Sequence, residues 1–157
     1  MTQVEERLAA AGHELHDPPA PAANYVPWVR TGSTIYVSGQ IPVVCGEIKA
    51  TGMVGDGGHS LEEAQGIAQI CALNAISVLK EAAADAGKTL DDLRILRLSG
   101  FVNVVPGFTD IHLVTNGASD LMALAFGKEG VHARSAVGMA ELPLGVPFEL
   151  EVIAEIQ

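Results

Sequence analysis

Basic residues are scarce in this chain. It carries 9 lysines and arginines against 19 aspartates and glutamates, a net charge of −10 over 157 residues. Binding of nucleic acid without regard to sequence depends on basic side chains that neutralise phosphates, and anionic membrane surfaces attract the same side chains. The composition therefore argues against nucleic acid and against anionic membranes as partners.

Cysteines and long apolar runs are also few. Only Cys45 and Cys71 are present, without metal-ligand spacing, and we expect two free thiols in a reducing compartment rather than a disulfide. No apolar run is predicted to span a bilayer. The acidic stretch 1–8 lacks the apolar centre of a signal peptide. These features together predict a cytoplasmic protein.

Motifs for metals, phosphates and nucleophilic catalysis are missing as well. The five histidines form no pair at metal-ligand spacing on one predicted face, so we expect no metal. The glycine-rich segment 46–58 lacks the Lys-Ser/Thr of a phosphate-binding loop. Ser38 and Ser135 have no obvious base nearby in the pattern. We expect a protein that works without a cofactor.

Apolar residues, in contrast, are abundant at 48% of the chain. A chain of this length holds one domain with a substantial core and is too short for two. The apolar content exceeds what one small core can cover, which indicates an oligomer.

The first half of the chain predicts a short helix, an arm and a hairpin. A helical pattern covers 4–11 and stops at Gly12, and the proline-rich stretch 17–21 is typical of an extended arm. Strand-like runs at 25–30 and 34–39 follow, and Pro27 makes the first an edge strand or a bulged one. We therefore separate residues 1–23, the helix and arm, from a single domain over residues 24–157.

The second half predicts two long helices and three strands. Ser60 and Glu63 form a capping box that opens a helix ending near Gly87. A strand over 96–105 and a helix within 108–126 follow; that helix starts near residue 108, or near residue 118 if Asn116-Gly117 is a turn. With two final strands, the pattern indicates an α+β sandwich, a mixed sheet with two long helices packed on one face.

The final two strands carry the most informative pair of residues. Arg134 stands among small and apolar residues, and Glu149 stands within an alternating Phe-Glu-Leu-Glu-Val run. An unpaired buried charge is costly, so Arg134 needs an anionic partner, either a protein carboxylate or a ligand carboxylate held by its planar guanidinium. An internal salt bridge between two adjacent antiparallel strands is at least as well supported by the sequence as a catalytic pair.

Several motifs in the same order resemble one known family. They are Tyr25, the run Val37-Ser38-Gly39-Gln40-Ile41-Pro42, a long helix, Ala133-Arg134-Ser135, Leu142-Pro143, and the run 149–154. This order and spacing is similar to that of the Rid family, also called the YjgF-type family, from about Asn24 to the C-terminus.

The resemblance implies a chorismate-mutase-like α+β fold and homotrimers with ligand clefts between subunits. It also implies hydrolysis of reactive enamines and imines, such as 2-aminoacrylate and 2-iminopropionate, to 2-keto acids and ammonia. By the same resemblance, Arg134 holds the substrate carboxylate and Glu149 serves the attacking water. Tyr25, Ser38 and Gly39 would line the cleft.

The chain also departs from the family pattern. Ala136 stands where the best-known members have a cysteine, which is harmless if that position acts through its backbone carbonyl. Asn116 lies near the position where members of the family have an asparagine, and His112 and Ser119 are alternatives for that position in the cleft. Residues 1–23 form an atypical extension. A non-catalytic module that binds a small carboxylate metabolite is the main alternative function, and the acidic charge makes a ribonuclease the least favoured one.

Overall fold

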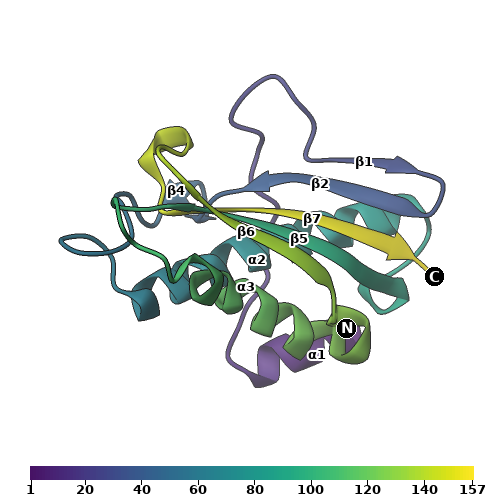
Figure 1. Cartoon of the computed structure of the whole chain (residues 1–157). Helices are drawn as coiled ribbons and strands as arrows, with labels where there is room; N and C mark the ends of the chain where they lie inside the picture. The colour runs from purple at the N-terminus through teal and green to yellow at the C-terminus, as the bar shows by residue number, and fades with distance from the viewer.

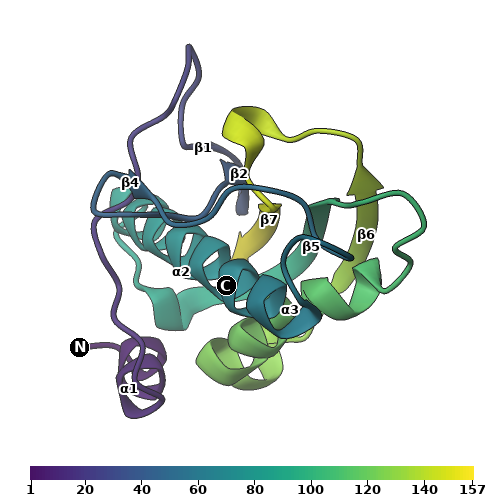
Figure 2. The same ribbon diagram turned by 90° about the vertical axis from the view of Figure 1, so that its left-hand side faces the viewer.

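A five-stranded mixed sheet covered by helices on one face forms the protein. The computed structural model describes all 157 residues. The strand order in the sheet is β1-β2-β7-β5-β6, and a separate two-stranded hairpin, β3-β4, follows β2. Figures 1 and 2 show the two long helices, α2 and α3, on the same side of the sheet. The predicted α+β sandwich is confirmed. The strands are β1 (Trp28–Thr31), β2 (Thr34–Gln40), β3 (Val43–Val44), β4 (Glu47–Ile48), β5 (Leu93–Asn103), β6 (Ala133–Met139) and β7 (Phe148–Ile156).

Helix α2 (Leu61–Asp85) begins where the sequence predicts. The Ser60 hydroxyl accepts a hydrogen bond from the Glu63 backbone N–H at 3.2 Å, and the Glu63 carboxylate accepts one from the Ser60 N–H at 2.8 Å. This reciprocal capping box satisfies two backbone donors at the start of the helix. Gly87, with φ 71°, lies just beyond its end.

Helix α3 (Ile111–Phe126) runs without a break through Asn116-Gly117, so a turn at that position is wrong. The glycine serves helix packing instead. A Cβ atom at Gly117 would overlap the backbone of Gln65 in α2, so its absence lets the two helices approach closely. Sequence alone does not distinguish a glycine at a helix crossing from a glycine in a turn.

Helix α2 is long and apolar enough, by length and composition alone, to cross a membrane, so the expectation that no segment reaches this measure is wrong. However, 67% of its apolar window is buried inside the protein. A helix that packs against both a sheet and a second helix needs the same apolar composition, and α2 contributes a large part of the core.

The N-terminal helix α1 (Gln3–Ala10) packs onto this core. Val4 and Leu8 are only 2% and 1% exposed, and Arg7 Nη1 donates to the Ala125 carbonyl of α3 at 3.1 Å. From α1 the chain runs past the β3-β4 hairpin to the other side of the sheet, where it forms the loop before β1 (Figures 1 and 2). We call residues 16–23 the arm. Strand β1 starts at Trp28 rather than at Tyr25, just after Pro27, whose missing N–H cannot join a ladder.

The last two strands of the chain are not neighbours in the sheet. Strand β6 pairs in parallel with β5, and β7 pairs antiparallel with both β2 and β5. Strand β5 therefore separates β6 from β7, and the expected antiparallel pair of final strands is wrong. The chain passes from β5 through α3 to β6, and a helical crossover of this kind is the usual connection between parallel strands. The predicted order of strand, helix and strand is compatible with this parallel pairing.

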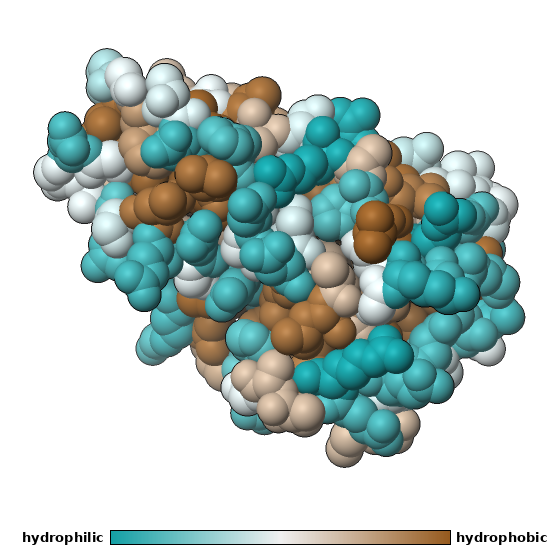
Figure 3. All heavy atoms as spheres, turned by 60° about the horizontal axis from the view of Figure 1, so that its bottom comes forward, coloured by the Kyte–Doolittle hydropathy of each residue, from teal (hydrophilic) through white to brown (hydrophobic).

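The two faces of the sheet differ in what covers them. On the helix side, apolar surface occurs as separate patches between hydrophilic residues (Figure 3). The opposite, open face carries no helix, and large apolar side chains on it stay partly exposed: Tyr36 by 45% and Val137 by 44%. Exposed apolar side chains on a sheet face without a covering layer favour a subunit interface, although Arg97 and Glu151 on the same face are charged.

Candidate functional site

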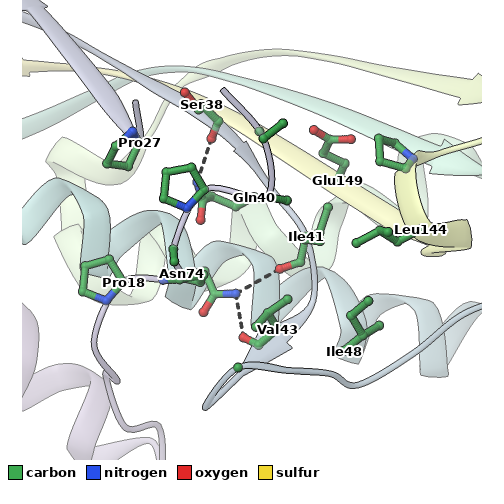
Figure 4. A pocket seen from close by; sticks show the side chains of 18 of the residues that line it. Pro18, Pro27, Ser38, Gln40, Ile41, Val43, Ile48, Asn74, Leu144 and Glu149 are labelled. Carbon is green, nitrogen blue, oxygen red and sulfur yellow. Dashed lines mark hydrogen bonds between the residues drawn. The ribbon is translucent and has the colours of Figure 1, made fainter. Parts of the chain in front are cut away.

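A cavity of about 960 Å³ lies between the arm and one end of the sheet. Its walls come from the arm, the end of β2, the β3-β4 hairpin, the turn Pro143–Gly145 and the start of β7 (Figure 4). Four of the residues that the sequence predicts for the site line this cavity together: Tyr25, Ser38, Gly39 and Glu149. Segments more than 100 residues apart in the chain thus meet at one place.

Glu149 is the central group of the cavity. It is half-buried on the open face of β7, opposite Phe101 in the register with β5, and it points into the cavity in Figure 4. Its carboxylate has no hydrogen-bond donor and no basic partner within the chain. Burial, and then the nearby charge of Glu151, raise the pKa of Glu149 above its ordinary value. A half-buried carboxylate without an intramolecular partner is free to bind a ligand or a water molecule.

A bulge in β2 makes room for this carboxylate. The register between β2 and β7 shifts between Val37 and Gln40, so the Ser38-Gly39 pair does not follow the regular ladder. A Cβ atom at Gly39 would collide with a carboxylate oxygen of Glu149 and would lie 2.9 Å from its Cδ. A side chain at residue 39 would therefore displace the Glu149 carboxylate, and glycine leaves this position open to it.

Ser38 and Tyr25 line the cavity with hydroxyl groups that differ in whether the hydroxyl proton is used within the chain. The Ser38 hydroxyl donates to the Val26 carbonyl at 2.6 Å, which ties β2 to the loop before β1. The Tyr25 hydroxyl accepts from the Ala22 N–H at 3.3 Å, a contact that holds the arm, and its own proton is not used by the chain. Tyr25 is 47% exposed, so this proton is available to a ligand.

Sequence reasoning missed the residues that support the cavity floor. The buried Asn74 of α2 donates both amide hydrogens, to the Ile41 carbonyl at 3.0 Å and to the Val43 carbonyl at 2.8 Å. Gln40 donates to the Ser38 carbonyl at 2.8 Å. These bonds satisfy the irregular backbone between β2 and β3 and fix its shape. The available signal was an amide side chain among the mostly apolar buried residues of α2.

Arg134 lies on the other side of the sheet from Glu149. Its register partner in β5 is Leu98, which is fully buried under the helices, whereas Glu149 pairs with Phe101 on the open face. The expected salt bridge between Arg134 and Glu149 is therefore wrong, because β5 separates their strands and the two side chains leave the sheet in opposite directions.

The guanidinium of Arg134 is held by α3 instead of by a carboxylate. Nη1 donates to the Ser119 hydroxyl at 3.0 Å, and Nη2 donates to the His112 carbonyl at 2.8 Å. Ser119 lies 2.9 Å from His132 Nε2, and His132 Nδ1 lies 2.6 Å from the Gly130 carbonyl. All these contacts are satisfied when Nδ1 carries the proton and Ser119 donates to Nε2. No acidic side chain pairs with Arg134 in the chain.

Of the three candidates on α3, Ser119 and the backbone of His112 thus contact Arg134. Asn116 lies on the same helix face between them, and Ala136 follows Arg134 on the same face of β6, opposite Gly100. None of Arg134, Asn116 and Ala136 lines the cavity around Glu149. One chain therefore presents the predicted site as two separate halves.

No group of three or more histidine, cysteine or acidic side chains is arranged to hold a metal ion. Both thiols are free, Cys45 exposed and Cys71 buried. Burial, and then the charge of Glu149, raise the pKa of the Cys71 thiol well above its ordinary value, so this thiol stays protonated.

Comparison with known proteins agrees with this architecture. Residues 5–156 match the family described as "YjgF/chorismate mutase-like, putative endoribonuclease". The chain belongs to this family. It is 39% identical to protein TCP17 of Trypanosoma cruzi over 155 residues, which cover 98% of this chain and 94% of that protein.

Solved structures show the same fold. The crystal structure of Atu1372 from Agrobacterium tumefaciens, described as of unknown function, is 42% identical, has a TM-score of 0.87, and is matched over 99% of this chain and 93% of that one. The structure of Escherichia coli TdcF with bound serine is 26% identical, has a TM-score of 0.61, and is matched over 92% and 97%. The match to Atu1372 includes nearly all of the chain, so α1 and the arm are shared with that relative.

Proposed function

We propose that the protein hydrolyses reactive enamine and imine intermediates, of the 2-aminoacrylate and 2-iminopropionate type, to 2-keto acids and ammonia. The observation that carries this proposal is Glu149, a half-buried carboxylate with a raised pKa and no partner in the chain, at the wall of a large cavity. A carboxylate of this kind suits a general base that takes a proton from water.

The chemistry balances with the groups present. The oxygen of a water molecule bonds to the imine carbon while Glu149 takes one proton from that water, which gives a carbinolamine. Glu149 returns this proton to the nitrogen, which leaves as ammonia as the carbon–oxygen double bond forms, and the hydroxyl proton passes to the freed Glu149 carboxylate. An iminium ion is already electrophilic, so positioning and proton transfer are the main requirements. The negative charge of Glu149 and Glu151 favours a cationic iminium in the cavity.

The substrate carboxylate needs a positive group that the cavity of one chain lacks. No lysine or arginine is among the residues that line it. Arg134 is half-buried, has no acidic partner, and lies on the opposite side of the sheet. We therefore assign the carboxylate grip to Arg134 of a second copy, in a homotrimer that covers the open face of the sheet, where Tyr36 and Val137 are exposed. The bound serine in the structure of TdcF supports a small amino-acid-like ligand for a member of this fold.

The charge of the cavity also bears on the ribonuclease label that the family description carries. Asp17, Glu149 and Glu151 line it without any compensating basic side chain, and the whole chain has a net charge of −10. Phosphodiester backbones are repelled by such a surface. We therefore propose that the protein does not act on nucleic acid.

An ammonia-release assay tests the proposal. Imines are generated in situ from amino acids by an amino acid oxidase, and the protein should accelerate their hydrolysis. Glu149→Gln keeps shape and hydrogen bonding but removes the base, and it should lower kcat roughly 100-fold or more. Arg134→Lys keeps the charge but loses the planar fork and should mainly raise KM.

Thermal unfolding of the same samples separates this function from its alternatives. Neither variant breaks a salt bridge, so both should keep nearly the wild-type melting temperature. Stable variants with unchanged hydrolysis would remove Glu149 and Arg134 from the chemistry. No hydrolysis by the wild type, together with binding of small carboxylates that depends on Arg134, would identify a non-catalytic binding module.

A further inference from the structure

The cavity is much larger than the imines named above require. Its volume of about 960 Å³ is near the top of the range of roughly 300–1,000 Å³ that is typical of pockets for drug-sized ligands. A three-carbon imino acid held at Glu149 would leave most of this space unfilled. Arg134 of the second copy would take part of this space, and the rest has room for a larger substrate side chain.

Two walls of the cavity away from Glu149 are mainly apolar, although His16, Asp17, Gln40 and Asn74 also line it. The arm contributes Pro18, Pro19, Ala20 and Pro21 to one wall, and Ile48 and Leu144 stand on another. Figure 4 shows Leu144 near Glu149, and Ile48 farther from Glu149 on the other side of Leu144. On the floor, both amide hydrogens of Asn74 already bind backbone carbonyls, so they are not available to a ligand. An apolar group is therefore the chemical match for this part of the cavity.

Backbone strain is concentrated on the same walls. Cys45 and Leu144 are the only residues other than glycine with positive φ, at 51° and 58°, and both line this cavity. The left-handed conformation is unfavourable for residues with a Cβ atom, and such strain tends to be kept at functional sites. Leu144 is also 60% exposed, so a strained backbone presents an apolar side chain to solvent at the edge of the cavity.

We infer that the substrate is an imino acid with a large apolar or aromatic side chain, which lies between the arm and the Ile48–Leu144 wall while its C=N bond lies at Glu149. This inference rests on the proposed function for the reacting end of the molecule. Covering Leu144 with the substrate side chain removes apolar surface from water that the free protein leaves exposed.

A panel of imines tests this substrate class. Imines derived from alanine, leucine and phenylalanine are compared under the same oxidase conditions. The kcat/KM for the leucine and phenylalanine imines should exceed that for the alanine imine by roughly tenfold or more. Leu144→Ala and Ile48→Ala should lower kcat/KM for the phenylalanine imine by several-fold more than for the alanine imine. Leu124→Ala, which removes an apolar side chain 41% exposed on α3 and outside the cavity, is the matched control.

Calorimetry with stable acids separates this inference from the proposed reaction. We expect 3-phenylpropanoate to bind more tightly than propanoate, and Leu144→Ala to reduce the difference. If no imine is hydrolysed but this preference is present, the reaction is wrong and the apolar pocket stands. If the alanine imine is hydrolysed best and the two acids bind equally, the substrate class is overturned and the reaction stands. If neither hydrolysis nor binding occurs, both are overturned.

Discussion

The carboxylate of Glu149 lies directly against the Cα atom of Gly39, in the place that a side chain at residue 39 would occupy. The contact joins the bulge of β2 to the start of β7 and determines where the carboxylate points. It follows that the identity of residue 39 controls the position of the proposed base.

Replacement of Gly39 by alanine should therefore impair activity through Glu149. The added Cβ atom forces the flexible carboxylate away from its position, while the surrounding backbone stays in place. We expect a drop in kcat that approaches the effect of Glu149→Gln, with only a small loss of thermal stability. Steady-state kinetics of imine hydrolysis and a thermal melt on the same sample measure both quantities.

Gly66→Ala is a matched control for that experiment. Gly66 lies inside α2, and a Cβ atom there meets nothing within 4 Å. Alanine should stabilise the helix by roughly 0.5–1 kcal/mol and leave kcat unchanged. If Gly39→Ala retained full activity, the position of the Glu149 carboxylate would not matter for the reaction.

The sequence predicts the helices and strands of this fold better than it predicts which strands pair in the sheet. The capping box at Ser60 and Glu63 is a local feature, and the start of α2 follows from it directly. The pairing of β6 and β7 is not local. Both final strands have the alternation of sheet residues, but which strand lies between them depends on the crossover through α3, so the expected salt bridge between Arg134 and Glu149 is wrong.

The candidate site shows the same division. Tyr25, Ser38, Gly39 and Glu149 were predicted from a family resemblance, and they meet at one cavity. The contribution of the arm could not be predicted, because a proline-rich segment has no periodicity that shows which surface it follows. The bonds of Ser119 with Arg134 and His132 were likewise hidden, since they join α3, a loop and β6.

Ser119 should act as a positioning residue for Arg134. Its hydroxyl accepts from the guanidinium at 3.0 Å and lies 2.9 Å from His132 Nε2. Ser119→Ala removes one of the two anchors of the guanidinium, and we expect KM to rise several-fold with a smaller change in kcat. Ser135→Ala is the control. Ser135 lies on β6 next to Arg134, but its hydroxyl accepts from Arg97 of β5 at 3.1 Å, so this variant should leave KM unchanged. An equal KM in both variants would show that His112 alone positions Arg134.

Glu5 should give the N-terminal helix a pH-dependent attachment. A hydrogen bond from Lys80, at 2.7 Å between Nζ and the carboxylate, and then the Thr2 backbone N–H, lower the pKa of Glu5 from 4.5 to about 2. Because the folded-state pKa is below the unfolded one, this stabilisation is present above pH 4.5 and is lost as pH falls toward 2. Glu5→Gln should cost about 1 kcal/mol at pH 7 and progressively less on acidification, as followed by urea unfolding across that range. A cost that did not change with pH would show that the carboxylate charge plays no part.

A mixing experiment tests whether two copies share the site. Arg134→Ala and Glu149→Gln should each be nearly inactive, because each removes one half of every site. In oligomers assembled from equal amounts of both variants, some sites combine the intact Arg134 of one copy with the intact Glu149 of its neighbour. Random assembly should then restore roughly a quarter of the wild-type activity. If instead each chain built its site alone, every site in the mixture would carry one defect and activity would stay at the level of the separate variants. Mixing the two purified variants without dissociating them first supplies the control, since intact oligomers that do not exchange subunits should gain no activity.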